Sequence, residues 1–290
     1  MRRLPLALSA AGAALLLAAP AAVPAADVGS GSYTGGALGE QPALAYLLVA
    51  RDKESFQALL TVRADCEGYA VPVQATVAIR DGRLEDDGTA TVTKRITGDV
   101  TGPDGQAAKE DGEATVTLAV DPDGAAEGTM RLRSTFRDAS TGEPVAECDT
   151  GSVPFLVMAV PPDAGEGRAR KPRRGGLLLG VVDANPLVAE VRRSGRIERM
   201  AFLYRSGCQR KQRIVFVPAI TPGRKGAFRV RGSQQLFTGE GSVEQVTFRM
   251  TGRYGRDGGL RGTLRVQGEL EGRECDSGEL KWRAAPAPRT

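Results

Sequence analysis

The chain of 290 residues contains no histidine and only one tryptophan, and aromatic residues make up 5% of it. Without histidine, Ser-His-Asp and Cys-His catalysis, imidazole-ligated zinc and imidazole acid–base chemistry are excluded. The sequence also lacks a Gly-x-Ser-x-Gly motif, a phosphate-binding Gly-x-x-x-x-Gly-Lys loop and the EF-hand spacing. Any catalysis would have to rest on carboxylates, lysine or tyrosine. We therefore expect a protein that is not an enzyme and that needs no cofactor or metal.

Two acidic features of the chain could argue against this expectation. Glu143 and Glu147 could be posed as the acid and base of a glycosidase, but they lie in or beside a turn-rich loop and are better interpreted as solvated acids. The segments 85–88 and 121–124 faintly resemble calcium loops. Their Asp-Gly pairs supply the positive φ that hairpins need, so turns are the better interpretation. A carboxylate-based hydrolase is therefore the least favoured function.

A long apolar run occurs only at the N-terminus. Met1-Arg2-Arg3 is followed by apolar residues 4–19 and by small residues and prolines up to Ala26, a pattern typical of a secretory signal peptide over residues 1–26. The run is too short and too rich in alanine for a good membrane span, although an uncleaved N-terminal anchor is the alternative. We expect no transmembrane segment and a protein that is secreted to the extracellular space or the cell envelope.

The rest of the chain is internally duplicated. The segments 41–157 and 185–284 share, in the same order, a first cysteine, a Gly-Thr-x-Arg run and a closing Glu-Cys-Asp-(Thr/Ser)-Gly. We therefore predict two domains of like fold. The predicted divisions are a signal peptide (1–26), a first domain (27–160), a basic Pro/Gly linker (161–174), a second domain (175–285) and a tail (286–290).

The chain has four cysteines, which favour disulfides in an exported protein. Three pairings are possible, and the duplication selects the one in which each copy owns one pair. We predict bridges between Cys66 and Cys148 and between Cys208 and Cys275. Metal binding by these cysteines is disfavoured, because the chain has no Cys-x-x-Cys and no histidine.

Short alternating segments separated by Gly, Asp and Pro turns predict an all-β chain with about eight antiparallel strands in each copy. The alternation places one face of each strand in the core and the other in water. It also predicts that Trp282, and Phe155 at the matching place, are buried. The predicted bridges join connections that would lie on opposite rims of an open round barrel. They therefore favour a flattened eight-stranded barrel or a two-sheet β-sandwich.

The end of the second copy carries Gly262-Thr263-Leu264-Arg265, then Cys275-Asp276-Ser277-Gly278, then Trp282-Arg283-Ala284. It resembles the end of a recurrent domain of uncharacterised secreted bacterial proteins. The resemblance covers the last quarter of the second copy. The first copy departs from it with Phe155 and Thr150 in place of the tryptophan and serine. The resemblance implies a secreted, disulfide-bridged β domain, and it implies no catalytic residue.

The net charge of +4 hides an asymmetry between the copies. Residues 27–160 hold 11 Lys/Arg against 22 Asp/Glu, whereas residues 175–290 hold 21 against 11. Alternation places eight basic residues of the second copy on the outer side of four consecutive strands. These residues, which we call the basic face, are Arg229, Arg231, Arg249, Arg253, Arg261, Arg265, Lys281 and Arg283.

Such a face would attract an anionic polymer or an acidic protein surface. Specific nucleic-acid binding lacks support, because no aromatic residues alternate with the arginines to stack bases. Two alternatives stay open: arginine is simply the usual surface cation of this chain, or the basic domain pairs with the acidic one inside the molecule. We expect a non-catalytic binding or structural protein, and the alternative is a lipocalin-like carrier of a small ligand inside a barrel.

Overall fold

The computed structural model contains only strands, turns and loops in the residues it describes. The predicted signal peptide and linker lie outside those residues. No helix in the described part of the chain is long and apolar enough to cross a membrane. The described residues are 29–37, 42–69, 73–122, 124–159, 175–205, 212–237, 243–270 and 273–287.

The strands fall into two consecutive sets, one for each predicted copy. The first set is β1 (Gly31–Ala37), β2 (Ala43–Val49), β3 (Ser55–Ala64), β4 (Cys66–Glu67), β5 (Val73–Arg83), β6 (Thr89–Thr101), β7 (Ala107–Val120), β8 (Ala125–Asp138), β9 (Pro144–Asp149) and β10 (Val153–Ala159). The second set is β11 (Gly176–Val182), β12 (Asn185–Val191), β13 (Ile197–Arg205), β14 (Gln212–Val217), β15 (Ala227–Phe237), β16 (Val243–Tyr254), β17 (Leu260–Leu270), β18 (Arg273–Asp276) and β19 (Leu280–Pro286). The last strand runs one residue past the predicted domain end.

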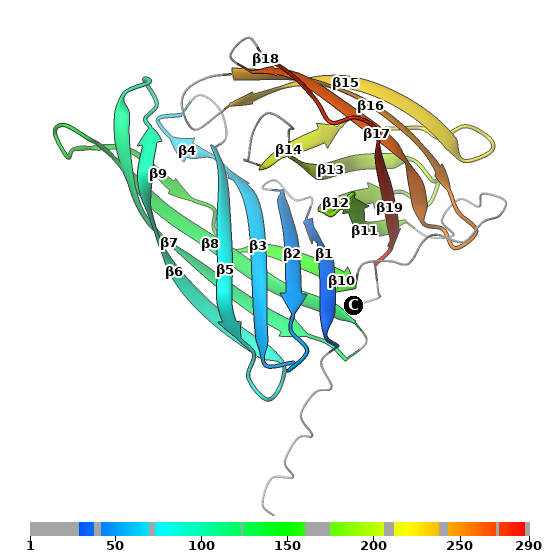
Figure 1. Cartoon of the computed structure of the whole chain (residues 1–290), viewed down its shortest axis with the longest axis horizontal. Helices are drawn as coiled ribbons and strands as arrows, with labels where there is room; N and C mark the ends of the chain where they lie inside the picture. The colour runs from blue at the N-terminus through cyan, green and yellow to red at the C-terminus, as the bar shows by residue number, and fades with distance from the viewer. Residues whose placement is uncertain are drawn as a thin grey trace, which may run out of the picture.

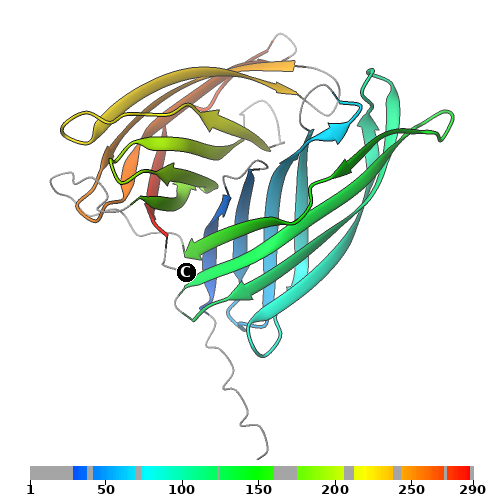
Figure 2. The same cartoon turned by 180° about the vertical axis from the view of Figure 1, so that it is seen from behind.

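Each set forms a nearly closed, barrel-like antiparallel sheet, as Figures 1 and 2 show from opposite sides. In the first barrel β1 pairs with β2 and β10, and β8 pairs with β7, β9 and β10. The second barrel repeats the scheme, with β11 between β12 and β19 and with β17 between β16 and β19. The all-β class, the tandem duplication and the eight-stranded wall are thus confirmed. The form is a barrel rather than a sandwich.

Each barrel has one break in its backbone ladder, between β5 and β6 in the first and between β14 and β15 in the second. Side chains span these breaks. The Lys94 ammonium donates to the Ala78 carbonyl across the first break. Across the second, the Gln234 amide accepts from Phe216 N at 2.9 Å and donates to Ile214 O at 3.3 Å. These bonds satisfy backbone groups that a free strand edge would offer to another chain.

The interior of each barrel is apolar and holds the predicted aromatic side chain. Trp282 and Phe155 are 2% and 5% exposed. Each lies directly opposite the glycine of the Gly-Thr-x-Arg run on the neighbouring strand, Gly262 or Gly128. A side chain on Gly128 would approach the Phe155 ring to 2.7 Å, so this glycine leaves the space that the ring fills.

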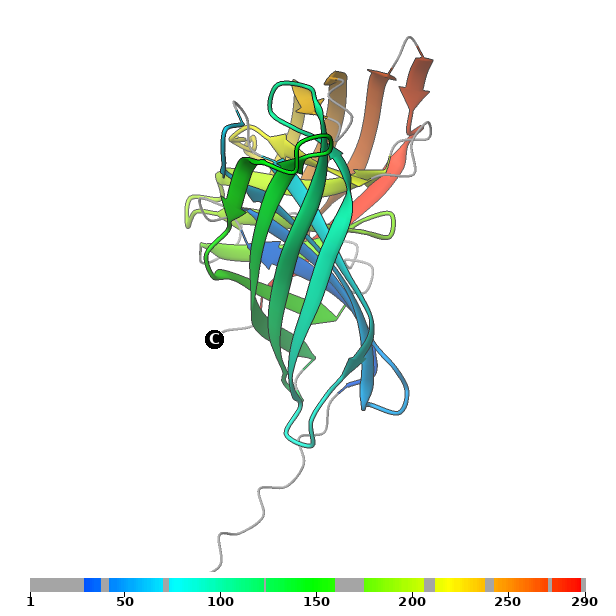
Figure 3. The ribbon, with the colours of Figure 1, turned by 90° about the vertical axis from the view of Figure 1, so that its left-hand side faces the viewer.

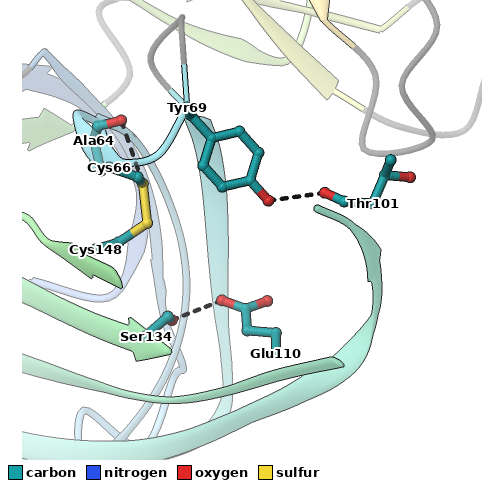
Figure 4. The surroundings of a disulfide bond; sticks show 7 residues. All are labelled: Ala64, Cys66, Tyr69, Thr101, Glu110, Ser134 and Cys148. Atoms are coloured by element: carbon teal, nitrogen blue, oxygen red, sulfur yellow. Dashed lines mark hydrogen bonds between the residues drawn. A yellow bond between two sulfur atoms is a disulfide. The ribbon is translucent and has the colours of Figure 1, made fainter. Parts of the chain in front are cut away.

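The predicted Cys66–Cys148 bridge is present, with 4.4 Å between the Cα atoms (Figure 4). Its cysteines lie directly opposite each other on the short strands β4 and β9. Strand β4 follows β3 and strand β9 pairs with β8, so the bridge links these two parts of the sheet beyond the ends of β10, β1 and β2. Around the bridge, Tyr69 donates to the Thr101 carbonyl at 2.8 Å, and the buried Ser134 hydroxyl donates to Glu110 at 2.7 Å. Cys208 lies outside the described residues, so the second bridge stays a prediction.

The two barrels pack against each other through an apolar contact between their outer walls. Leu44 of the first barrel packs with a cluster from β11 to β14 that includes Leu179 and Val188, all three 0% exposed. The buried Thr34 hydroxyl donates to the Gly180 carbonyl at 3.0 Å across this contact. Strands β1 and β2 lie against β12 there, and β1 also lies against β11 (Figure 1); Figure 3 views the molecule with the first barrel in front of the second.

The expectation of one wet face per strand is therefore wrong for these strands. The segment β11 is buried along nearly its whole length, and β12 is similar. Their outer faces are dry because the other barrel covers them. At the rim of the contact, the Gln74 amide of β5 accepts from Ile214 N at 2.9 Å, and the Arg63 guanidinium lies 5.0 Å from the centre of the Phe216 ring.

Candidate functional site

The two shared motifs meet in space and form one structural unit. In the second barrel, Arg265 of the Gly-Thr-x-Arg run pairs with Asp276 of the Cys-Asp-Ser-Gly run, with Nε 2.9 Å from Oδ1. In the first, Arg131 pairs with Asp149, with Nη2 2.7 Å from Oδ2. Arg265 holds the pKa of the Asp276 carboxyl at about 2, and Arg131 likewise keeps that of Asp149 far below its ordinary range.

The other motif residues complete this unit. The Ser277 hydroxyl accepts from Val266 N at 2.9 Å, and the Asp276 carboxylate accepts from Gly278 N at 2.9 Å. Gly278 has a φ of +65°, a conformation that favours glycine. Thr150, Asp149 and Gly151 make the same bonds in the first barrel. The motifs that the two copies share are thus explained by folding, and Arg265 has a structural partner on the neighbouring strand.

The basic face lies on β15, β16, β17 and β19, which run side by side in the second barrel (Figure 1). The register of these strands arranges the cations in rows across them. Arg249 lies directly between Arg231 and Arg265 in the first row. Arg261 lies between Arg253 and Arg283 in the third. The middle row runs Arg229, Thr251, Thr263, Lys281. The structure therefore brings all eight sequence-predicted residues together on one outer wall.

Most of these cations are exposed. Only Arg261 and Arg283 are half-buried. Arg229, Arg231, Arg249, Arg253 and Lys281 make no ion pair within the described residues. The strands of the basic face also lie apart from the apolar contact between the barrels, which uses β11 to β14. The described interface is thus not an electrostatic pairing of the basic face with the acidic domain.

The first barrel supplies a built-in comparison, because the shared motif aligns the two walls residue by residue. Arg131 is the single cation at the eight equivalent positions. The row equivalent to Arg231, Arg249 and Arg265 is Thr93, Thr115 and Arg131. The remaining equivalents are Thr91, Ala119, Glu127, Pro154 and Leu156. Seven of the eight cations are therefore specific to the second barrel and are not required by the fold.

The other sequence candidates gain no support as sites. Glu143 and Glu147 are both exposed, the first in a turn and the second on β9. Gly88 and Gly124, the last residues of the two acidic segments, both have a φ of +81°, which suits a tight turn. No group of three or more His, Cys, Asp or Glu that could hold a metal ion occurs among the described residues.

A small cavity lies inside the first barrel, lined by apolar side chains such as Leu47, Phe56 and Leu118. Its volume is about 10 Å³, room for one water molecule at most. Sites for drug-sized ligands span roughly 300–1,000 Å³. The side chains that fill the second barrel include Phe202, Phe248 and Trp282.

Comparison of the sequence with models of known protein families gave no match, and comparison with curated proteins gave none either.

Proposed function

We propose that this chain is a non-catalytic binding protein of the cell envelope or extracellular space, and that the basic face of its second barrel contacts a polyanion. The observation that carries the proposal is the alignment of eight cations in adjacent rows at positions where the equivalent wall of the first barrel has one. The part of the proposal that concerns export is supported by the signal-peptide pattern of residues 1–26.

The cross-strand arrangement supports a functional reason for these cations. Like charges placed directly opposite each other destabilise a sheet. Arg249 nevertheless has an arginine on each side, whereas its equivalent Thr115 faces Thr93 on one side. General use of arginine as a surface residue would not favour such rows. A bound polyanion would remove the repulsion by neutralising the row.

A lipocalin-like carrier is the second candidate, and no observation favours it. The cavity in the first barrel is more than tenfold smaller than a site for a drug-sized ligand. The proposal of a binding surface therefore has more support than the proposal of an internal ligand site.

The test is a titration of the full-length protein with inorganic polyphosphate at low and at physiological salt. Binding should weaken log-linearly with salt, because it releases counterions. The variant Arg229→Ser/Arg231→Ser/Arg249→Ser/Arg253→Ser should lower the affinity. The slope of log K against log salt concentration should become less steep by about 3.

The matched control removes four exposed turn cations from the same barrel, Arg193→Ser/Arg224→Ser/Lys225→Ser/Arg256→Ser. It changes the net charge equally and should leave most of the affinity. Equal losses in the two variants would mean that net charge alone causes the binding. No binding by the unaltered protein at low salt would refute the proposed function.

A further inference from the structure

The cations of the basic face do not form a uniform patch, because they surround a pair of threonines. Thr251 and Thr263 occupy the centre of the middle row, and their hydroxyls are hydrogen-bonded at 3.0 Å. Arg229 and Lys281 end this row, one on each outer strand. The rows of three arginines lie on either side of it. The face is therefore a track with cations along both edges and at both ends.

The centre of the track is held from inside the barrel. The Trp282 indole N–H donates to the Thr251 carbonyl at 3.0 Å and to the Thr263 carbonyl at 3.3 Å. A side chain on Gly252 would come within 2.5 Å of the Trp282 ring, so glycine is needed for this fit. The first barrel has the same threonine pair, Thr117 and Thr129 at 2.8 Å, but a phenylalanine in place of the indole donor. A rigid backbone here reduces the entropy that binding must overcome.

The dimensions and shape of the track favour one kind of occupant. Neighbouring strands lie about 4.8 Å apart, so the middle row spans about 14 Å from β15 to β19. Alternate residues on a strand are about 6.8 Å apart, which places an arginine row at that distance on each side. The strands curve over the outside of the barrel (Figure 1), so a flat surface would contact only part of the face.

A membrane surface is the less suitable partner for a second reason. Proteins that lie on membranes insert apolar or aromatic side chains below the headgroups. The exposed large hydrophobic residue among the described ones is Leu48, which lies on β2 of the other barrel. The basic face offers charge and hydroxyls but no such anchor.

We propose that a single linear polyanion chain, with phosphate- or sulfate-like groups, lies along the middle row and crosses β15, β16, β17 and β19. This inference rests on the proposed function. It adds the class of the ligand, its direction across the strands and a minimum length of about 14 Å, the span of the middle row. Arginine suits the role, because its planar guanidinium can bind an oxyanion through two hydrogen bonds.

The experiment measures binding of triphosphate and of long-chain polyphosphate to the full-length protein by calorimetry at low salt, with Trp282 fluorescence as a check of folding. The end variant Arg229→Ser/Lys281→Ser should weaken long-chain binding by about tenfold or more and triphosphate binding by less than about twofold. The flank variant Arg231→Ser/Arg253→Ser removes equal charge and should weaken both ligands by similar factors.

The turn variant Arg224→Ser/Lys225→Ser is the matched control, and it should change neither affinity by more than about twofold. Equal effects of the end and flank variants on long-chain binding, with no effect of the turn variant, would overturn the track but leave the proposed function intact. Tighter binding to phosphatidylglycerol vesicles than to polyphosphate would overturn it in favour of a lipid surface. Failure of every polyanion to bind would remove the proposed function and the track together.

Discussion

Replacing Arg249 with threonine should make the protein more stable and a weaker polyanion binder. Arg249 lies directly opposite Arg231 on one strand and Arg265 on the other, and threonine is the residue at the equivalent position of the first barrel. Each like-charged cross-strand pair costs about 0.2–1 kcal/mol. The two pairs together would cost about 0.4–2 kcal/mol. Because Asp276 partly neutralises Arg265, we expect the free energy of unfolding to rise by the lower part of that range, about 0.4–1 kcal/mol.

For a chain of this size, such a gain corresponds to a rise in Tm of about 1–4 °C. The assay is thermal unfolding followed by far-UV circular dichroism at low ionic strength and near 0.5 M salt. The gain should shrink at high salt, because salt screens the repulsion between exposed charges. Threonine also has a higher β propensity than arginine, and that part of the effect should not depend on salt.

The control is Arg224→Thr, the same substitution at an exposed turn residue of the same barrel. It should change Tm little at either salt concentration. A destabilised Arg249→Thr variant, or a gain of equal size at high and low salt, would refute the reasoning from charge repulsion. Polyphosphate should also raise the Tm of the unaltered protein more than that of Arg249→Thr, because at a given ligand concentration the tighter-bound ligand stabilises the native state more.

Three further predictions concern the fold. Replacing Cys66 and Cys148 together with alanine should lower the free energy of unfolding by up to roughly 4 kcal/mol, because their bridge closes a loop with a sequence separation of 82. Peptide mapping without reduction should link these two cysteines to each other. Trp282→Ala should cost about 3–5 kcal/mol, and native emission typical of exposed indole would contradict the buried position. Arg265 lowers the folded-state pKa of Asp276 from 3.8 to about 2. The ionised Asp276 should therefore stabilise the fold fully above pH 4, and this contribution should be lost as the pH falls from about 4 to 2.

The acid prediction has its own matched pair of variants. Asp276→Asn should flatten the dependence of the urea midpoint on pH in that window. Glu279→Gln, an exposed carboxylate close by in the chain without a side-chain hydrogen bond among the described residues, should leave the dependence unchanged. Identical pH profiles for the two variants would show that the Asp276 pair contributes nothing to acid stability.

Much of the architecture follows from local sequence signals, and the parts that do not are non-local. Alternation predicted the all-β class and placed Trp282 inside the second domain. The short strands β4, β9 and β18 are additional to the eight strands expected in each copy. Strands β9 and β18 each form only along the edge of a longer neighbour, β8 or β17, and β4 pairs only with β9. The covered wall of the second barrel could have been inferred from the continuous apolar run in β11, since a strand wet on one side alternates.

In the basic face, too, local sequence signals predicted part of the arrangement and could not predict the non-local part. Alternation identified which side of each strand the arginines occupy, because that depends only on residue spacing. It could not show that Arg249 faces two arginines, since the register between strands sets that arrangement. Nor could it pair Arg265 with Asp276, which lies on the next strand. Arg265 therefore stabilises the fold through its ion pair with Asp276, and it is also one of the cations of the basic face.

The apolar contact between the barrels also bears on how the two copies could diverge. Strands β11 and β12 are dry on both sides, so a charge introduced there would be buried and costly. The wall of β15, β16, β17 and β19 lies outside that contact, so the contact imposes no such cost on charges there. Cutting the second barrel from the first would expose the apolar outer faces of β11 and β12 to water.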